Sequence, residues 1–203
     1  LSVNIGLIEL SLTAIFVGNG LGQIIYGAIA DRYGRKPVIL ITLFIFFITT
    51  VGAGMASNIE TLIFWRFIQG LLMASGRILA NAVARDLFER KRLTKLITLV
   101  IAIGILSSLL SAPVGGYLAE NYNWQTVFWF MSLYAAITFM SFLFFFKETI
   151  KNNDPNALNL TILLRNFRAI LSNKNFVLNV FCGGFILAGV VAFLNSSAGV
   201  LIN

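Results

Sequence analysis

The sequence contains no histidine and a single cysteine, Cys182. Without histidine, the chain has neither a Ser-His catalytic pair nor a histidine-ligated metal site. A single cysteine also excludes a disulfide bond within the chain. We therefore predict no metal site and no catalytic site of these kinds.

Charged residues are scarce as well. They make up 11% of the 203 residues, against about 25% in an average soluble domain. Hydrophobic residues make up 58%, and the mean hydropathy is +0.87. This composition is typical of a membrane protein with several spans, so we predict an all-α, polytopic fold.

Long apolar segments fill most of the chain, and a helix needs about 20 such residues to cross a bilayer. Six segments are expected to span the membrane: residues 1–30, 37–56, 61–84, 96–118, 126–146 and 176–202. In the first span, Gly18 and Gly22 are spaced as in contacts between helices. In the fourth, Pro113 and the pair Gly115-Gly116 are expected to break the helix. No methionine or basic signal-peptide region opens the sequence, so we expect its start to lie inside a larger protein.

Basic residues are concentrated on one side of these spans. Segments 31–36, 85–95 and 147–175 contain 3, 5 and 5 of the 15 lysines and arginines, and the other two, Arg66 and Arg77, lie inside the third span. Because basic residues resist translocation, all three segments are predicted to be cytoplasmic. Membrane topology thus explains the net charge of +7, and we predict no nucleic-acid partner.

The segment 147–175 is the only long polar stretch. Its residues 152–156, Asn-Asn-Asp-Pro-Asn, are typical of a flexible break. Apolar residues then recur at helical spacing, with Arg165 and Arg168 on the other side. The apolar residues are Leu160, Leu163, Leu164, Phe167, Ile170 and Leu171. This pattern predicts an amphipathic helix, which either lies on the membrane surface or packs on the protein as a linker helix.

Residues 27–37 are predicted to form a short charged turn between the first two spans. Six residues set its pattern, Gly-x-x-x-Asp-Arg-x-Gly-Arg-Lys: Gly27, Asp31, Arg32, Gly34, Arg35 and Lys36. A generic basic turn is one interpretation. The spacing, however, resembles the signature that joins transmembrane helices 2 and 3 in the major facilitator superfamily.

The resemblance implies that this turn is a latch, which holds the cytoplasmic side closed in the outward-open state. Gly27 would let a neighbouring helix approach closely. Asp31 would face the positive N-terminus of a helix from the other half of the protein. Arg35 and Lys36 would add ion pairs between the two halves.

Two further motifs extend the resemblance. In the third span, three residues resemble the Arg-x-x-Gln-Gly signature of helix 4: Arg66, Gln69 and Gly70. In the fourth span, a proline and a glycine pair resemble the antiporter signature of helix 5: Pro113, Gly115 and Gly116. One residue separates this proline from the glycine pair, whereas the family usually has two.

Shorter matches are similar to the bicyclomycin-resistance (Bcr/CflA) subfamily of multidrug:proton antiporters, at residues 23–27, 85–88 and 147–149. The resemblance implies that the chain corresponds to helices 2 to 7 of twelve. Three parts would follow: most of the N-terminal bundle in residues 1–146, the central linker in 147–175, and the first helix of the C-terminal bundle in 176–203.

Arg66 and Arg77 are charges inside a predicted span, where each costs about 2.5–3.5 kcal/mol on insertion scales. At about 100° per residue, their spacing returns them to the same helix face within roughly 20°. Gly70 and Met73 lie beside them, and we interpret this face as lining a cavity. Arg66 then either forms a structural ion pair or a hydrogen bond to backbone, or takes part in proton coupling. Arg77 either contacts substrate or forms a structural pair.

Glu9 is the only acidic residue within the predicted spans. It is either a proton carrier near the outer end of its helix or a solvated residue at the outer surface. The resemblance also allows the proton-coupling acid to lie in helix 1, outside this chain. Four further residues are candidates for a substrate cavity: Phe16, Gln23, Met73 and Asn81.

We therefore expect a secondary transporter that exports small hydrophobic compounds, including drugs, in exchange for protons by alternating access. Its partners would be the lipid bilayer, a small-molecule substrate and the proton. The proton gradient would drive it without a cofactor, and the full-length protein would be a monomer in a bacterial inner membrane. The alternatives are a metabolite, sugar or siderophore transporter of the same superfamily and, more remotely, an integral-membrane enzyme or a non-transporting sensor.

Overall fold

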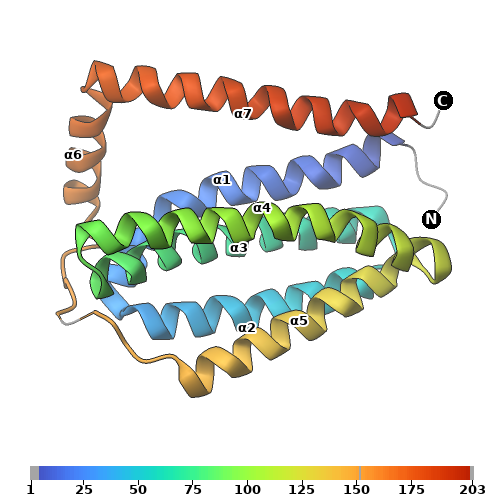
Figure 1. The fold of residues 1–203 in the computed structure, drawn as a ribbon, viewed down its shortest axis with the longest axis horizontal. Coiled ribbons are helices and arrows are strands. Elements are labelled where there is room, and N and C mark those ends of the chain that lie inside the picture. The colour runs from blue at the N-terminus through green and yellow to red at the C-terminus, as the bar shows by residue number, and fades with distance from the viewer. Residues whose placement is uncertain (1–4, 151, 202–203) are drawn as a thin grey trace. The chain divides into compact units, whose positions relative to one another are not determined.

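The computed structural model describes residues 5–150 and 152–201, and the regular secondary structure in these ranges is entirely helical (Figure 1). The helices are α1 (Ile5–Tyr33), α2 (Arg35–Gly54), α3 (Ile59–Leu87), α4 (Arg90–Asn121), α5 (Trp124–Phe145), α6 (Leu160–Leu171) and α7 (Lys174–Leu201). The predicted all-α fold is confirmed. Leu1, Lys151 and Ile202, which the predicted segments include, lie outside the described residues.

Five of these helices, α1 to α5, are long and apolar enough to cross a membrane. Within the described residues, a sixth span is counted only when α6 and α7, which meet at 83°, are taken as one bent pair. The chain divides into two compact units between Pro155 and Asn156. This boundary lies inside the predicted linker rather than at either of its ends.

The first charged turn is much shorter than predicted. α1 continues through Asp31 to Tyr33, α2 begins at Arg35, and Gly34 alone lies between them. Gly34 has a φ of 99°, a left-handed conformation that is accessible to glycine without steric cost. Arginine and lysine are good helix formers, so the charged residues extend both helices instead of forming a loop.

The second predicted loop, residues 85–95, is also mostly helical. α3 ends at Leu87 and α4 begins at Arg90, so only Phe88 and Glu89 separate the two helices. Long basic side chains at such helix ends can reach the polar membrane interface. The charges therefore mark where the apolar spans end, but the helices themselves continue beyond that point.

α4 is one continuous helix that includes Pro113, so the prediction of a break in the fourth span is wrong. A proline removes one intrahelical hydrogen bond. Membrane-spanning helices tolerate this loss when local adjustments or nearby groups satisfy the freed carbonyl. None of the α4 side chains that the structure describes is buried.

Three glycines bring the backbones of α1 and α3 together. A Cβ placed on Gly18 would lie 2.9 Å from the backbone nitrogen of Leu71, and one on Gly22 would collide with the carbonyl of the same residue. From the other helix, a Cβ on Gly70 would collide with the backbone of Ile15. The contact predicted from the spacing of Gly18 and Gly22 is therefore confirmed.

Two clusters of buried apolar residues lie at opposite ends of α2. One joins the ends of α1, α2 and α3 and consists of Ala30, Val38, Ile39 and Leu79. The other joins α2, α3 and α5 and consists of Ala53, Ala56, Leu62 and Phe128. Between them, the buried Gln69 of α3 donates a hydrogen bond of 3.0 Å to Thr50 of α2. α2 is thus fixed to its neighbours along its whole length.

The second unit contains α6 and α7. The side chain of Asn159 accepts a hydrogen bond of 3.0 Å from the backbone N–H of Thr161 and thereby caps α6. This confirms the amphipathic helix predicted within residues 160–171. None of the residues of α6 is buried, and its position on a membrane surface stays a prediction.

Candidate functional site

Five residues meet at the end of the first unit where α1 passes into α2. They are Asp31, Arg35, Asp86, Glu148 and Thr149, and we call them the Arg35 cluster. The guanidinium of Arg35 lies 2.7 Å from a carboxylate oxygen of Asp31 and 3.1 Å from one of Asp86. These partners lie near the ends of α1 and α3, so one side chain joins three helices. The Arg35 side chain is only 9% exposed, so little solvent screens its ion pairs.

Glu148 follows α5 in sequence and caps the start of α2. Its two carboxylate oxygens accept hydrogen bonds from the backbone N–H groups of Arg35 and Lys36, both at 3.0 Å. These first-turn donors have no partner within their own helix. Gly34 precedes them and makes no side-chain cap, and a Cβ there would lie 2.6 Å from Oε2 of Glu148. The turn thus favours a glycine at this position, and the absence of a Cβ leaves room for the Glu148 carboxylate.

The surroundings of the Glu148 carboxylate lower its pKa. Partial burial acts in the opposite direction and raises the pKa. The backbone N–H groups of Ile150, Lys36, Arg35 and Thr149 hydrogen-bond the charged form and outweigh the effect of burial. Glu148 is therefore ionised at neutral pH, which suits a cap at the positive end of a helix.

We expect Glu148→Gln to lower the free energy of unfolding by roughly 1 kcal/mol at neutral pH, because glutamine removes the charge and one of the two acceptor oxygens at the start of α2. In the wild type, the contribution of the charge is complete above the ordinary glutamate pKa of 4.5. It is lost as the pH falls through the lower pKa of the folded state. Denaturant unfolding of the solubilised protein across a pH series measures the difference between the two proteins, which should shrink on acidification.

The matched control for this experiment is Glu120→Gln, which neutralises an exposed carboxylate near the end of α4. It should change the free energy of unfolding by less than about 0.5 kcal/mol. A difference between wild type and Glu148→Gln that stays constant from neutral to strongly acidic pH would contradict the capping role of the charge.

The segment that follows α5 crosses the ends of the other helices. The hydroxyl of Thr149 donates to the Asp86 carboxylate at 3.3 Å. Farther on, the backbone N–H of Asp154 donates to the Asp31 carbonyl at 2.9 Å. The first part of the predicted linker is therefore attached to the five-helix unit.

The residues of the predicted latch differ in the contacts that they make within the first unit. Arg35 pairs with Asp31 of α1 and Asp86 of α3 inside this unit, because the one-residue turn places its side chain beside both helices. The ammonium of Lys36 donates to the Leu143 carbonyl of α5 at 3.3 Å. No neighbouring helix of the described chain comes within 4 Å of a Cβ at Gly27. Arg32 is exposed and forms none of the cluster's ion pairs.

Arg66 lines a cavity of about 410 Å³ near the other end of the unit. Its guanidinium carbon lies 4.7 Å from the centre of the Phe128 ring, which is a cation–π contact. Its buried Nε atom has no hydrogen-bond partner among the described residues. The aromatic ring thus offsets part of the cost of this charge without a carboxylate partner.

Gln69 and Gly70, which we predicted to accompany Arg66, face neighbouring helices. Gln69 is 1% exposed and is bonded to Thr50, as described above. Gly70 lies against the backbone of Ile15 in α1. α2 covers Gln69 and α1 covers Gly70. Neither residue therefore lines the cavity of Arg66.

Arg77 and Asn81 line a different cavity, between α3 and α4. The two arginines of α3 therefore do not share one cavity, although they lie on one face of the helix. Met73 is 49% exposed and lines neither cavity. Cβ atoms placed on Gly115 and Gly116 would meet no neighbour within 4 Å, so neither glycine of the antiporter-like segment lies in close contact with another described helix.

The face of α1 opposite α3 is uncovered in the first unit. Glu9, Phe16 and Gln23 lie roughly 140–180° around the helix from Gly18, and all three are exposed. The Gln23 amide donates a hydrogen bond of 3.5 Å to the Asn19 side chain. A spanning helix thus presents polar groups that no helix of this unit contacts.

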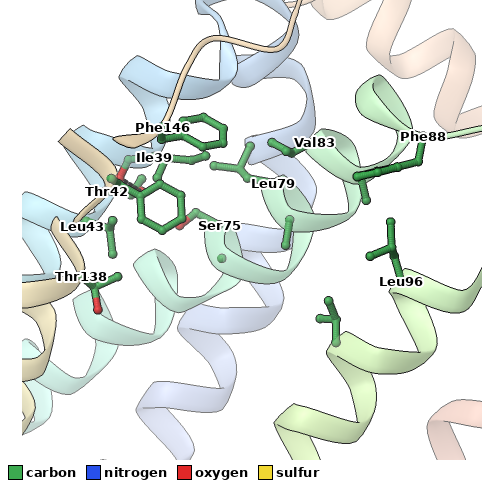
Figure 2. A pocket seen from close by; sticks show the side chains of 15 residues that line it. Ile39, Thr42, Leu43, Ser75, Leu79, Val83, Phe88, Leu96, Thr138 and Phe146 are labelled. Carbon is green, nitrogen blue, oxygen red and sulfur yellow. Dashed lines mark hydrogen bonds between the residues drawn. The ribbon is translucent and has the colours of Figure 1, made fainter. Parts of the chain in front are cut away.

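An apolar cavity of about 410 Å³ lies between α2, α3, α4 and α5 (Figure 2). Thr42 and Ser75 belong to its lining. Each of their hydroxyls, however, donates a hydrogen bond to a backbone carbonyl of its own helix. The cavity therefore presents mainly hydrocarbon, from residues such as Leu79, Val83 and Phe146. Local sequence patterns did not predict it, because its lining comes from four helices.

Asp86, Glu148 and Phe128 were not predicted as site residues. Asp86 and Glu148 lie in segments that we placed on the same side of the membrane as Arg35. Few acidic residues lie on that side, so Asp86 and Glu148 could have been considered as ion-pair or hydrogen-bond partners of the basic residues there. Nothing in the sequence indicated the contact of Phe128 with Arg66.

The family model described as Major Facilitator Superfamily matches residues 1–201. The chain is 34% identical over 205 residues to multidrug resistance protein D of Escherichia coli (strain K12). The aligned region covers 100% of this chain and 50% of that protein. The chain is 28% identical over 195 residues to a bicyclomycin resistance protein homolog of Haemophilus influenzae, with 96% of this chain and 49% of that protein covered. The chain spans about half the length of the curated relatives it matches.

Among solved structures, the crystal structure of the human organic anion transporter MFSD10 (TETRAN) is similar to this chain. The TM-score is 0.61 at 22% sequence identity, and the match covers 76% of this chain and 36% of that one. At this identity, the similarity concerns the fold alone.

Proposed function

This chain belongs to the major facilitator superfamily, and on this premise we propose that the whole protein is a secondary active transporter that exports small, mostly hydrophobic compounds in exchange for protons. The names of two relatives, a multidrug resistance protein and a bicyclomycin resistance protein homolog, support export of drug-like compounds. Membership of a transporter family also speaks against the alternative of an integral-membrane enzyme. We further propose a monomer in a bacterial inner membrane, with the basic segments on the cytoplasmic side.

The uncovered polar face of α1 carries this proposal. Polar groups within a membrane span are costly against lipid and normally face protein or a water-filled cavity. Glu9 and Gln23 lie on that face, and the other helices of the unit do not cover it. A second bundle facing α1 across a water-filled cavity would satisfy these groups, which is the arrangement used for alternating access.

The Arg35 cluster would let α1, α2, α3 and the segment after α5 move as one body. Its ion pairs and the cap by Glu148 join α1, α2, α3 and the segment after α5. The Asp31 side chain remains 48% exposed, so it is available to a further partner. We propose that this partner is the N-terminus of a helix in the other half, which completes the latch in one conformation.

The proposal is tested with the whole protein in liposomes under an imposed pH gradient. Ethidium, a hydrophobic cation, is expected to elicit proton flux across the membrane, measured with an internal pH-sensitive dye, and to be exchanged against protons. The control is liposomes without protein. No proton flux with any member of a panel of hydrophobic compounds would refute the proposal. Flux with sugars or siderophores alone would favour the alternative substrates.

The same assay locates the proton carrier. Glu9→Gln removes the one acid within the apolar spans predicted from the sequence. Loss of ethidium-dependent proton flux in this variant would assign proton transfer to Glu9. Unchanged flux would exclude Glu9 as the proton carrier.

A further inference from the structure

Arg77 is a charge inside a spanning helix, and none of the described residues supplies it with a counter-charge. It lies ten residues before the end of α3 at Leu87, which is about 15 Å of helix at about 1.5 Å per residue. The ion pairs found between described residues join Arg35 to Asp31 and Asp86, and Arg77 takes part in neither. Arg66 on the same helix has the ring of Phe128 as a partner, whereas Arg77 is exposed.

The side chain of Arg77 lines a cavity of about 450 Å³ between α3 and α4. Only one other polar side chain, Asn81, belongs to the lining. Asn81 follows Arg77 by four residues, so the two side chains are neighbours on one face of the helix. The opposite wall is contributed by α4 and is apolar: Ile97, Val100, Ile101 and Gly104.

These features define the chemistry of a ligand. A guanidinium presents its N–H donors as a planar fork that fits a carboxylate with two parallel hydrogen bonds. The amide of Asn81 would add a donor to the same group. The apolar wall would accept a hydrocarbon or aromatic body, and the volume lies within the usual range of about 300–1,000 Å³ for small-molecule sites.

We propose that this cavity binds the carboxylate of an amphiphilic organic anion, with Arg77 and Asn81 as the groups that contact the carboxylate. The inference rests on the proposed transport function in one respect, namely that the bound anion is a transported substrate. It adds amphiphilic organic acids to the hydrophobic compounds that we propose as substrates.

The test compares 2-naphthoate with 2-naphthamide, which have the same aromatic body and differ in the charge of one group. Binding to the whole solubilised protein is measured by calorimetry. We expect the wild type to bind naphthoate about tenfold more tightly than naphthamide, as hydrogen bonds to charged groups generally permit. Arg77→Gln should remove this preference and leave naphthamide binding unchanged. Asn81→Ala should weaken naphthoate binding about threefold.

The control is Arg168→Gln, which removes an equal charge from α6 and should leave both affinities unchanged. Arg77→Lys keeps a positive charge without the planar fork and should retain part of the preference. If Arg77→Gln does not fold, Arg77→Lys and Asn81→Ala together provide the test. Equal wild-type affinities for the two ligands, or a preference that survives in Arg77→Gln, would overturn the inference.

Lipid headgroups are the other source of an anion. If phosphatidylglycerol in nanodiscs displaces naphthoate from the wild type, and phosphatidylcholine does not, the cavity is a lipid site and the inference falls. The liposome assay keeps the two proposals apart. Ethidium-driven proton flux without naphthoate binding would refute this inference alone. Naphthoate binding that depends on Arg77, without proton flux for any compound, would refute the transport proposal alone.

Discussion

Replacing Arg35 with alanine is expected to lower the free energy of unfolding by about 3 kcal/mol, near the lower end of the range for breaking a buried ion pair. The substitution leaves the carboxylates of Asp31 and Asp86 close together without their shared counter-charge. The lower end of the range applies because the Asp31 side chain is 48% exposed and water can solvate it. Denaturant titration of the solubilised protein at neutral pH measures the loss.

The neighbouring variant Arg32→Ala serves as the control, since Arg32 is exposed and lies outside the cluster. It should change the free energy of unfolding by less than about 0.5 kcal/mol. Arg35→Lys should fall between the two, because an ammonium keeps the charge but lacks the fork that reaches both carboxylates. Equal effects of Arg32→Ala and Arg35→Ala would mean that the Arg35 cluster does not stabilise the bundle.

Gly18→Val is expected to cost about 3 kcal/mol or more, because overpacking against an interface that cannot relax is among the most damaging core changes. A Cβ at this position already meets the backbone of Phe67 and Leu71 in α3. A backbone has no rotamer with which to give way, so α1 and α3 must separate. Unfolding of the solubilised protein by a denaturing detergent would show the loss.

Gly20→Val provides the matched comparison on the same helix. A Cβ on Gly20 meets nothing within 4 Å, and valine has a better helix propensity than glycine by a few tenths of a kcal/mol, within the total range of about 1 kcal/mol. This variant should therefore be neutral or slightly more stable. If the two variants are equally destabilised, the close contact of α1 with α3 does not hold the unit together.

Hydropathy located the five spans of the first unit well, because nearly every residue of such a segment must be apolar. The helix ends were less predictable. We interpreted the charges of residues 31–36 and 85–95 as loops, but charge shows only where the apolar span ends. The conformation of Gly34, with its φ of 99°, decides where the first turn lies, and a glycine in the sequence does not reveal its φ.

The side-chain contacts of the candidate site were the least predictable part. Arg35 and Asp86 are 51 positions apart, and Arg35 and Glu148 are 113 apart. The family resemblance selected segments that contain all three residues, but no local pattern states which of them meet. Likewise, Arg66 and Arg77 share a helix face, as their spacing predicted. Which cavity each one lines depends on the positions of α4 and α5.

The cap that Glu148 supplies to α2 also has a consequence for synthesis of the chain. The donors at Arg35 and Lys36 leave the ribosome 113 and 112 residues ahead of their acceptor. At about 5–20 residues per second, the start of α2 waits roughly 6–23 s for its cap. The start of α2 can therefore be capped only after α5 has been made.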